Sequence, residues 1–206
     1  MKILKIILPV LILYGVLQAQ TPVIQNIQNK FSKINTLNAD FSQSSRINGS
    51  HNNFSTKGKI YYQKDDKYRI ELRNQEIISD GTTFWNFNKK TNKVVINDLK
   101  NEKSAFSFKN LIQDYPSRSN VESAGRETFD GENLDVTKLT PKKKGENYSL
   151  IKIWSDQNSL VRRVEITDKA GLVNSFEFSN IRLNSAIPLS KFSFEPPKGS
   201  EVVDLR

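Results

Sequence analysis

The sequence has 206 residues, with 31 basic against 22 acidic side chains and a formal net charge of +9. It has no cysteine and a single histidine, His51, which excludes disulfides, thiol nucleophiles and multi-histidine metal sites. The basic residues are scattered among acidic ones and form no stripe with interleaved aromatic residues, so we expect no nucleic-acid partner. We also expect no cofactor.

The N-terminus has the pattern of a secretory signal peptide. Lys2 and Lys5 flank the start of an apolar run over residues 6–16, and the small Ala19 ends the segment. This run is short for a membrane span, and a retained anchor helix is the alternative. We predict a signal peptide over residues 1–19 and one mature domain over residues 20–206, exported to the periplasm or to the outside of the cell. The lack of cysteine excludes a lipid-modified N-terminus.

The first element expected in the mature chain is an amphipathic helix over residues 22–36. Pro22 suits its first turn. Apolar residues recur at spacings of three and four, which places them on one helical face. These residues are Ile24, Ile27, Phe31, Ile34 and Leu37.

From Asp40 onward the apolar period is two, which is typical of β-strands. The clearest example is residues 67–73, where Tyr68, Ile70 and Leu72 alternate with charged residues. We expect the charged face to meet water and the apolar face to point into the protein. A membrane-spanning barrel needs the opposite arrangement.

The strand pattern continues to residue 183 and is interrupted once. Residues 102–115 are more helical than alternating, and we expect this helix to stop at Pro116. Asp80-Gly81 and Asp130-Gly131 have the composition of hairpin turns. The remaining strands are expected over residues 40–47, 54–63, 76–79, 82–88, 93–97, 121–129, 134–139, 148–154, 160–167 and 172–183.

A long antiparallel sheet with one apolar face must curve or partly close over that face. We predict a mainly β fold, a strongly curved or partly closed barrel of about ten or eleven strands, with two helices that seal its edges or fill its interior. Periodicity alone leaves open whether the interior is hollow or filled. Aromatic residues expected on the inner faces are Tyr61 or Tyr62, Tyr68, Phe84, Trp85, Phe87, Trp154, Phe176 and Phe178.

Several short strings follow one another in an order that is typical of a known family. None of them is decisive alone. They are Leu-Asn-Ala-Asp-Phe-Ser-Gln at 37–43, the segment 58–62, Ser-Asp-Gly-Thr-Thr-Phe-Trp at 79–85, Phe-Ser-Phe-Glu-Pro-Pro-Lys-Gly at 192–199, and Val-Val-Asp at 202–204. Together they resemble the LolA family of outer-membrane lipoprotein carriers over essentially the whole mature chain.

The resemblance implies a mainly β fold, an open antiparallel half-barrel of about eleven strands with an α-helical lid over an apolar cavity. It also implies a periplasmic chaperone for lipoprotein transport. Such a carrier accepts acylated lipoproteins from an ATP-driven exporter in the inner membrane and passes them to an outer-membrane acceptor, whose identity here stays open. We expect a monomer. The implied acyl-chain cavity is lined by Tyr68, Ile70, Leu72, Phe84, Phe87, Phe176 and Phe178. The implied lid holds Ala105, Phe106, Phe108, Leu111 and Ile112.

One position departs from the family pattern. The family typically has an arginine followed by a proline before the alternating strand, and the arginine holds the lid shut. Here Lys64 and Asp65 occupy those two positions. A lysine offers a flexible point charge in place of a planar donor fork. Lys64 is therefore the candidate latch, and we expect the latch to be weaker than in the family or to be absent.

Three alternatives to the lipoprotein carrier remain open. The first is a carrier of another periplasmic lipid or acylated metabolite on the same scaffold. The second is a filled-barrel module that takes part in envelope interactions. The third is a hydrolase that uses Asp80 and Asp130, although turn chemistry already explains both carboxylates. We expect no enzyme. His51 lies in a polar Gly/Asn stretch, and we expect an exposed turn there.

Overall fold

The computed structural model describes residues 22–47, 54–101 and 110–206. Its first element is α1 (Pro22–Ser32), which begins at the predicted proline and buries Ile24 and Ile27. The helix ends four residues earlier than predicted because the chain already enters a strand at Thr36. Within the described ranges, no helix is long and apolar enough to cross a membrane.

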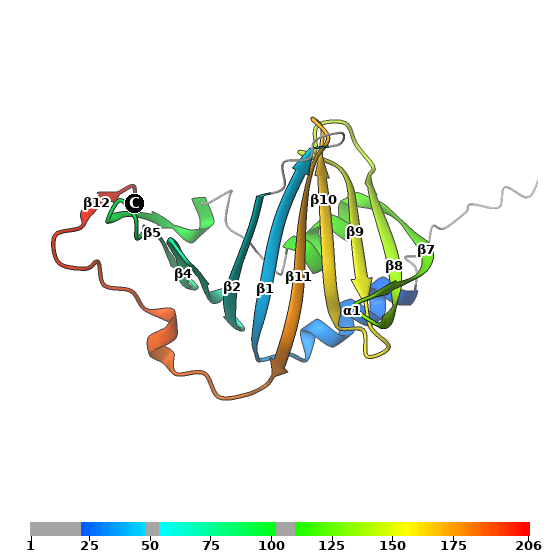
Figure 1. Cartoon of the computed structure of the whole chain (residues 1–206), viewed down its shortest axis with the longest axis horizontal. Helices are drawn as coiled ribbons and strands as arrows, with labels where there is room; N and C mark the ends of the chain where they lie inside the picture. The colour runs from blue at the N-terminus through cyan, green and yellow to red at the C-terminus, as the bar shows by residue number, and fades with distance from the viewer. Residues whose placement is uncertain (1–21, 48–53, 102–109) are drawn as a thin grey trace, which may run out of the picture.

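A single sheet contains all the strands of the described residues (Figure 1). Its spatial order is β12-β6-β5-β4-β3-β2-β1-β11-β10-β9-β8-β7. Neighbours are antiparallel except β12, which pairs with β6 in parallel. The strands are β1 (Thr36–Ile47), β2 (Phe54–Gln63), β3 (Lys67–Leu72), β4 (Gln75–Asp80), β5 (Thr83–Asn88), β6 (Lys93–Asp98), β7 (Ser119–Phe129), β8 (Glu132–Pro141), β9 (Tyr148–Ser155), β10 (Val161–Asp168), β11 (Leu172–Leu183) and β12 (Glu201–Asp204).

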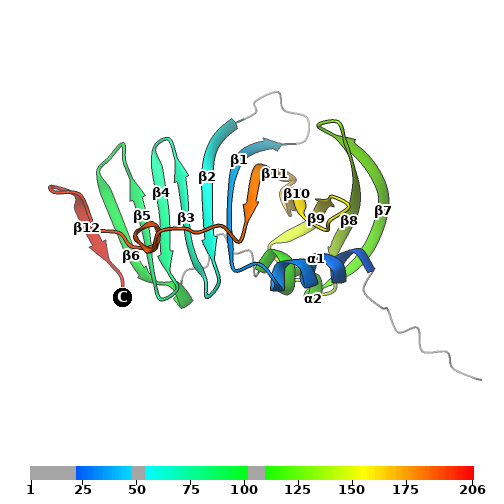
Figure 2. The ribbon, with the colours of Figure 1, turned by 90° about the horizontal axis from the view of Figure 1, so that it is seen from below.

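The open half-barrel predicted from the sequence is confirmed, with one strand more than the expected eleven. The additional strand is β12, whose four residues are too few to show a period in the sequence. Seen from below, β1 and β11–β7 form a strongly curved arc, and β2–β6 continue from it as a flatter wing (Figure 2). The concave face of this sheet is its inner face, and the opposite one is its outer face.

Helical elements lie across the open side of the arc (Figure 2). Besides α1 they are a π-helical turn, η2 (Asn110–Asp114), and α2 (Tyr115–Arg118). Two short 3-10 turns lie elsewhere, η1 (Leu99–Asn101) and η3 (Leu189–Phe192). The prediction that a helix stops at Pro116 is wrong. Pro116 instead lies in the first turn of α2, where its missing N–H is tolerated.

The main core lies between the inner face and these covering elements. Ile24 and Ile27 of α1 and Leu111 and Ile112 of η2 belong to the same buried cluster as the apolar residues of the strands. Burial of this face is the principal stabilising term, because each square ångström of apolar surface removed from water contributes roughly 25 cal/mol.

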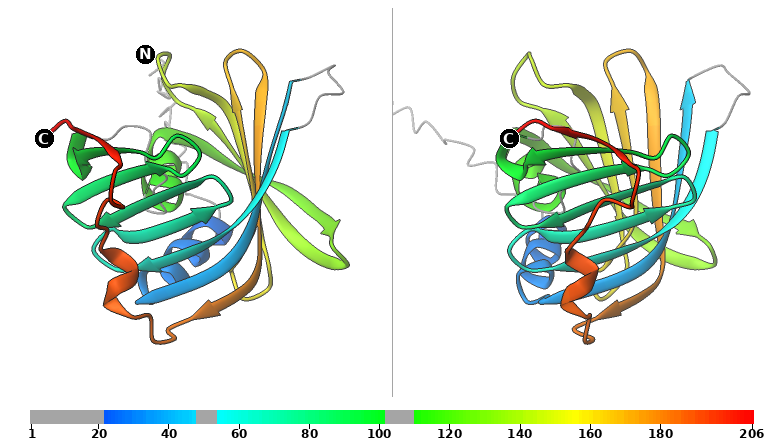
Figure 3. Two further views of the ribbon diagram at one scale, coloured as in Figure 1. Left: turned by 60° about the vertical axis from the view of Figure 1, so that its left-hand side comes forward. Right: turned by 90° about the vertical axis from the view of Figure 1, so that its left-hand side faces the viewer.

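The C-terminal segment, residues 184–206, covers part of the other face. After β11 it crosses the outer face of β3 and β4 through η3, buries Phe192, and ends as β12 beside β6 (Figure 3). The expectation that the charged face of β3 simply meets water is therefore corrected. That face is half-covered by the chain's own C-terminal segment, which returns from a distant part of the sequence.

Candidate apolar binding site

The strand register shows which residues share the inner face, since directly paired residues of antiparallel strands point to the same side. Each cross-strand row is apolar over several strands. The rows are Leu37, Tyr62, Tyr68, Ser79 and Phe84; then Ala39, Ile60, Ile70 and Ile77; then Phe41, Gly58 and Leu72. On the other side of β1, Phe41 is paired with Phe178 and Gln43 with Phe176.

Most of the predicted cavity residues therefore lie on one face. Tyr68, Ile70, Phe84 and Phe178 are buried within the main core. Leu72 and Phe176 are half-buried and pack against it.

Phe87 is the exception, and its prediction as a cavity residue is wrong. It is paired with Glu76 on the outer face, and its ring lies 5.4 Å from that of Phe194 in the C-terminal segment. Phe84 and Phe87 are three residues apart, so a period of two already places them on opposite faces.

Two further aromatic residues expected inside also lie on the outer face. Trp85 is paired with Ile78 and Ile96. Trp154 is paired with Val136 and belongs to a second, smaller core. Its indole Nε1–H donates to Glu127 over 2.9 Å, which satisfies a donor that burial would otherwise leave without water.

The described residues enclose a small apolar cavity on the inner face of the arc. A cavity of about 40 Å³ remains between α1, η2 and the sheet, and its lining is nearly all apolar. An engineered apolar cavity that holds one benzene measures about 150 Å³. An acyl chain therefore fits into this particular cavity only if a covering element moves. The residues that α1, its C-terminal extension and η2 contribute to this cavity are Ile27, Lys30, Phe31, Ile34, Leu111 and Ile112.

Apolar packing and a half-buried hydrogen bond join α1 to η2, and an aromatic contact joins α2 to the sheet. Gln28 Nε2 on α1 donates to the Ile112 carbonyl oxygen over 3.0 Å. The hydroxyls of Ser119 and Tyr148 lie 2.7 Å apart, and the Tyr148 ring packs edge-on against Tyr115. Burial raises the pKa of the Tyr115 hydroxyl above its ordinary value. Sequence reasoning missed Gln28, because a glutamine on a helix has no distinguishing pattern.

The predicted lid is described only at its end. Leu111 and Ile112 are buried in η2, with 3% and 2% of their surface exposed. The remaining predicted lid residues, Ala105, Phe106 and Phe108, lie outside the described residues, as does His51.

Lys64, the candidate latch, is exposed at the turn between β2 and β3. Its backbone N–H donates to the Asn35 carbonyl over 2.9 Å, and this contact would be available to any residue type except proline. Two positions earlier, burial together with Asp66 and Asp65 raises the pKa of Tyr62 to about 12.

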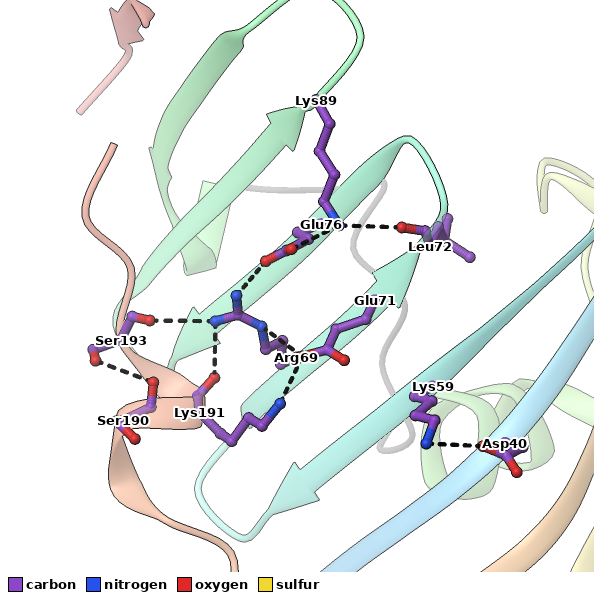
Figure 4. Close-up of polar contacts among 10 residues, drawn as sticks. All are labelled: Asp40, Lys59, Arg69, Glu71, Leu72, Glu76, Lys89, Ser190, Lys191 and Ser193. Carbon is purple, nitrogen blue, oxygen red and sulfur yellow. Dashed lines mark hydrogen bonds and ion pairs between the residues drawn. The ribbon is translucent and has the colours of Figure 1, made fainter. Parts of the chain in front are cut away.

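A network of charges lies beneath the C-terminal segment on the outer face (Figure 4). The Arg69 guanidinium is paired with Glu76 and donates to the carbonyls of Lys191 and Ser193 at 3.4 and 3.5 Å. Lys191 in turn pairs with Glu71 at 2.8 Å. The burial of Glu76 raises its pKa, but a hydrogen bond from Lys89 and the charge of Arg69 outweigh this and hold the pKa below its ordinary value.

Of the two aspartates of the hydrolase alternative, Asp80 has a structural role in its turn and Asp130 lies in a different turn. Asp80 Oδ1 accepts the N–H groups of Thr82 and Thr83 at 2.8 and 2.7 Å, which is ordinary turn chemistry. Asp130 lies in the β7–β8 turn and lines a groove together with residues of β1, β2 and β11. Among the described residues, no group of three or more metal-ligating side chains comes together.

Comparison with known proteins gives consistent findings. Residues 32–195 match the family model described as outer membrane lipoprotein carrier protein LolA. An outer-membrane lipoprotein carrier protein of Francisella tularensis is 22% identical over 203 residues and covers 97% of both chains. One of Haemophilus influenzae is 28% identical and covers 87% of this chain and 86% of the relative. The crystal structure of an uncharacterized conserved protein from Thermus thermophilus is similar in fold, with a TM-score of 0.58 at 12% identity, covering 88% of this chain and 96% of that one.

Proposed function

Because this chain belongs to the LolA family of outer membrane lipoprotein carrier proteins, we propose that it holds the acyl chains of lipoproteins against the inner face of its sheet while it carries them through the periplasm. Export through the N-terminal signal peptide, loading by an ATP-driven inner-membrane exporter and unloading to an outer-membrane acceptor belong to this proposal.

The observation that supports it most directly is how the inner face is covered. α1 and η2 lie over Leu37, Ala39 and Phe178 of this face, and a nearly apolar cavity lies between these two elements and the sheet. Separation of the two elements would expose a continuous apolar surface without breaking any strand pairing. Such a surface suits hydrocarbon chains, which carry no group that needs a polar partner.

The energetics favour partial burial of the cargo. Complete burial of one sixteen-carbon chain would contribute roughly 12 kcal/mol, at about 0.8 kcal/mol per CH₂. Three such chains would exceed the practical affinity limit of about 20 kcal/mol. A carrier that must also release its cargo therefore gains from a small resting cavity that opens only as far as the chains require.

The same small cavity favours the filled-barrel interaction module as the second candidate. Such a module would keep α1 and η2 in place and would bind no lipid. Carriage of another periplasmic lipid would require the same opening, and the identity of the bound molecule distinguishes it from lipoprotein carriage.

Native mass spectrometry of the protein purified from the periplasm tests the proposal. We expect a lipoprotein to accompany the wild-type chain. Leu72→Gln places an amide on the inner face and should lower the recovered cargo severalfold, because a buried polar group costs about 1–3 kcal/mol. Arg73→Gln is the matched control on an exposed neighbour and should leave recovery unchanged.

Two results would count against carriage of lipoproteins. Recovery of a different lipid alone would assign the cargo to that lipid. A wild-type chain that never carries a lipid or lipoprotein would support the filled module instead.

A further inference from the structure

The cavity between α1, η2 and the sheet is bordered by two polar side chains. Among the described residues that line it, Lys30 on α1 is the charged one, and Ser159, in the turn between β9 and β10, carries a hydroxyl group. The other lining residues are apolar. Pockets that bind small molecules commonly combine an apolar wall with a few polar groups, which fix the orientation of the ligand.

Lys30 brings a positive charge to this cavity that no acidic side chain of the described chain neutralises. It is half-buried and follows the buried Ile27 by three positions, so its methylene groups run along the same side of α1. A lysine in such a place buries its stem and keeps its ammonium in contact with water. Over residues 22–47, 54–101 and 110–206 this ammonium forms no ion pair.

Ser159 belongs to a turn that uses its own carboxylate internally. Asp156 Oδ1 accepts the N–H groups of Asn158 and Leu160 at 2.9 and 3.0 Å, and Asp156 Oδ2 lies 3.8 Å from the Arg162 guanidinium. Asp156 does not line the cavity. The part of the chain that the structure describes therefore gives the cavity two hydrogen-bond donors and no carboxylate of its own.

We propose that this cavity also binds a free amphiphile, a single acyl chain with an anionic head group held by the Lys30 ammonium and the Ser159 hydroxyl. The proposal rests on the carrier function, because the chain occupies the cavity that would take lipoprotein acyl chains, and it adds a second class of cargo. Carboxylate and phosphate heads both accept charge-assisted hydrogen bonds from such donors. An acyl chain joined as an ester or amide offers carbonyl oxygens but no charge.

The two donors lie on elements that an entering chain has to separate. Lys30 is part of α1, whereas Ser159 lies in the hairpin of the paired strands β9 and β10. The cavity of about 40 Å³ is too small for an acyl chain, so the chain must displace α1 from the sheet. A head group in the gap that this opens receives one donor from each side and stays in contact with water, which avoids the cost of burying its charge completely.

Binding of three ligands with the same chain length tests the proposal on the full chain, purified from the periplasm and freed of lipid. Laurate, dodecyl phosphate and methyl laurate compete with a neutral fluorescent probe, phenylnaphthylamine. The measured quantity is the preference, which is the affinity for an anion divided by the affinity for the neutral ester. The anion with the larger preference identifies the head group, and added salt should lower the preference through screening.

Lys30→Met keeps the apolar stem and removes the ammonium. It should lower the preference about five- to tenfold and leave the affinity for methyl laurate unchanged, because only the charged head loses its partner. Ser159→Ala removes the second donor and should lower the preference about two- to fivefold.

Lys33→Met is the matched control, since Lys33 is exposed, directly follows α1 and does not line the cavity. It removes the same charge from the same end of the helix, so it reproduces any general effect of net charge on anion binding. Its preference should equal that of the wild type. Equal losses in the Lys30 and Lys33 variants would overturn the proposal, as would an unchanged preference in Lys30→Met.

The remaining outcomes separate this proposal from the carrier function. If Lys30→Met weakens the ester as much as the anions, its stem has a packing role and the head-group site is overturned. A wild-type chain that carries a lipoprotein but binds none of the three ligands would keep the carrier function and overturn this proposal. Anion binding that depends on Lys30, in a chain that never carries a lipoprotein, would support the site and contradict lipoprotein carriage.

Discussion

Gly58 shows how a single residue shapes the inner face. It lies between Phe41 and Leu72 in one cross-strand row. A Cβ atom at this position would overlap the Glu71 carbonyl oxygen and lie 2.9 Å from side-chain atoms of both row neighbours. The glycine is therefore required for space, and the side chains of the inner face can approach the backbone of β2 closely.

Gly58→Ala should destabilise the fold by about 1–3 kcal/mol, the usual cost of overpacking a core. The loss should appear as a lower urea midpoint at an unchanged slope. Lys57→Ala, one position away on the opposite face, should change stability by no more than about 0.5 kcal/mol. Equal stability of the Gly58 variant and the wild type would show that β2 can shift to make room.

At the scale of a whole element, Arg69 shows how one side chain holds a chain segment in place. It is the residue beneath the C-terminal segment that joins β3 to both that segment and β4, through two backbone carbonyls and Glu76. Its side chain is only 16% exposed. The segment reaches this place after leaving β11, so the contact links elements that are far apart along the chain.

Arg69→Met keeps the aliphatic stem and removes every donor of the guanidinium. It should lower the free energy of unfolding by about 1–3 kcal/mol, because the carbonyls of Lys191 and Ser193 lose their donor and Glu76 keeps only Lys89 as a partner. The change should also make the C-terminal segment more accessible to limited proteolysis. Arg73→Met, an exposed arginine just beyond β3, is the control, and equal losses in the two variants would contradict the role given to Arg69.

The whole sheet is covered from both sides, and in different places. α1, η2 and α2 cover the inner face of the arc, whereas residues 184–206 cover the outer face of the wing (Figures 2 and 3). Each half of the molecule therefore has a face that depends on a non-neighbouring segment. This arrangement ties the wing to the arc, while α1, η2 and α2 take no part in strand pairing.

The charge network of the wing makes the stability of the molecule depend on pH. The pKa of Glu76 is lowered from its ordinary value of 4.5, so its contribution is fully present above that value and is lost as the pH falls through the lower folded-state pKa. Glu76→Gln should therefore reduce the loss of stability between pH 6 and pH 3 in urea unfolding. Glu122→Gln, at an exposed position, should leave the loss as in the wild type.

Several features of this protein could be predicted from the sequence because they are local. The period of four and three in residues 22–36 predicted α1, and the alternation of Tyr68, Ile70 and Leu72 predicted both β3 and its buried face. Turn composition predicted the hairpins at Asp80 and Asp130. The family strings predicted the open half-barrel and the family, as the match over residues 32–195 confirms.

Other features depended on contacts between distant segments, which periodicity cannot show. Alternation predicts that Phe84 and Phe87 lie on opposite faces, but only the fold shows that Phe194 covers Phe87. Likewise β12, the half-covered charged face of β3, and the bond from Gln28 to Ile112 arise from chain segments that meet only after folding. Local spacing was enough to establish which residues form strands and which face of each strand is apolar. Which segment covers each face was decided by the tertiary structure alone, because a face is buried only by contact with a segment that reaches it after folding.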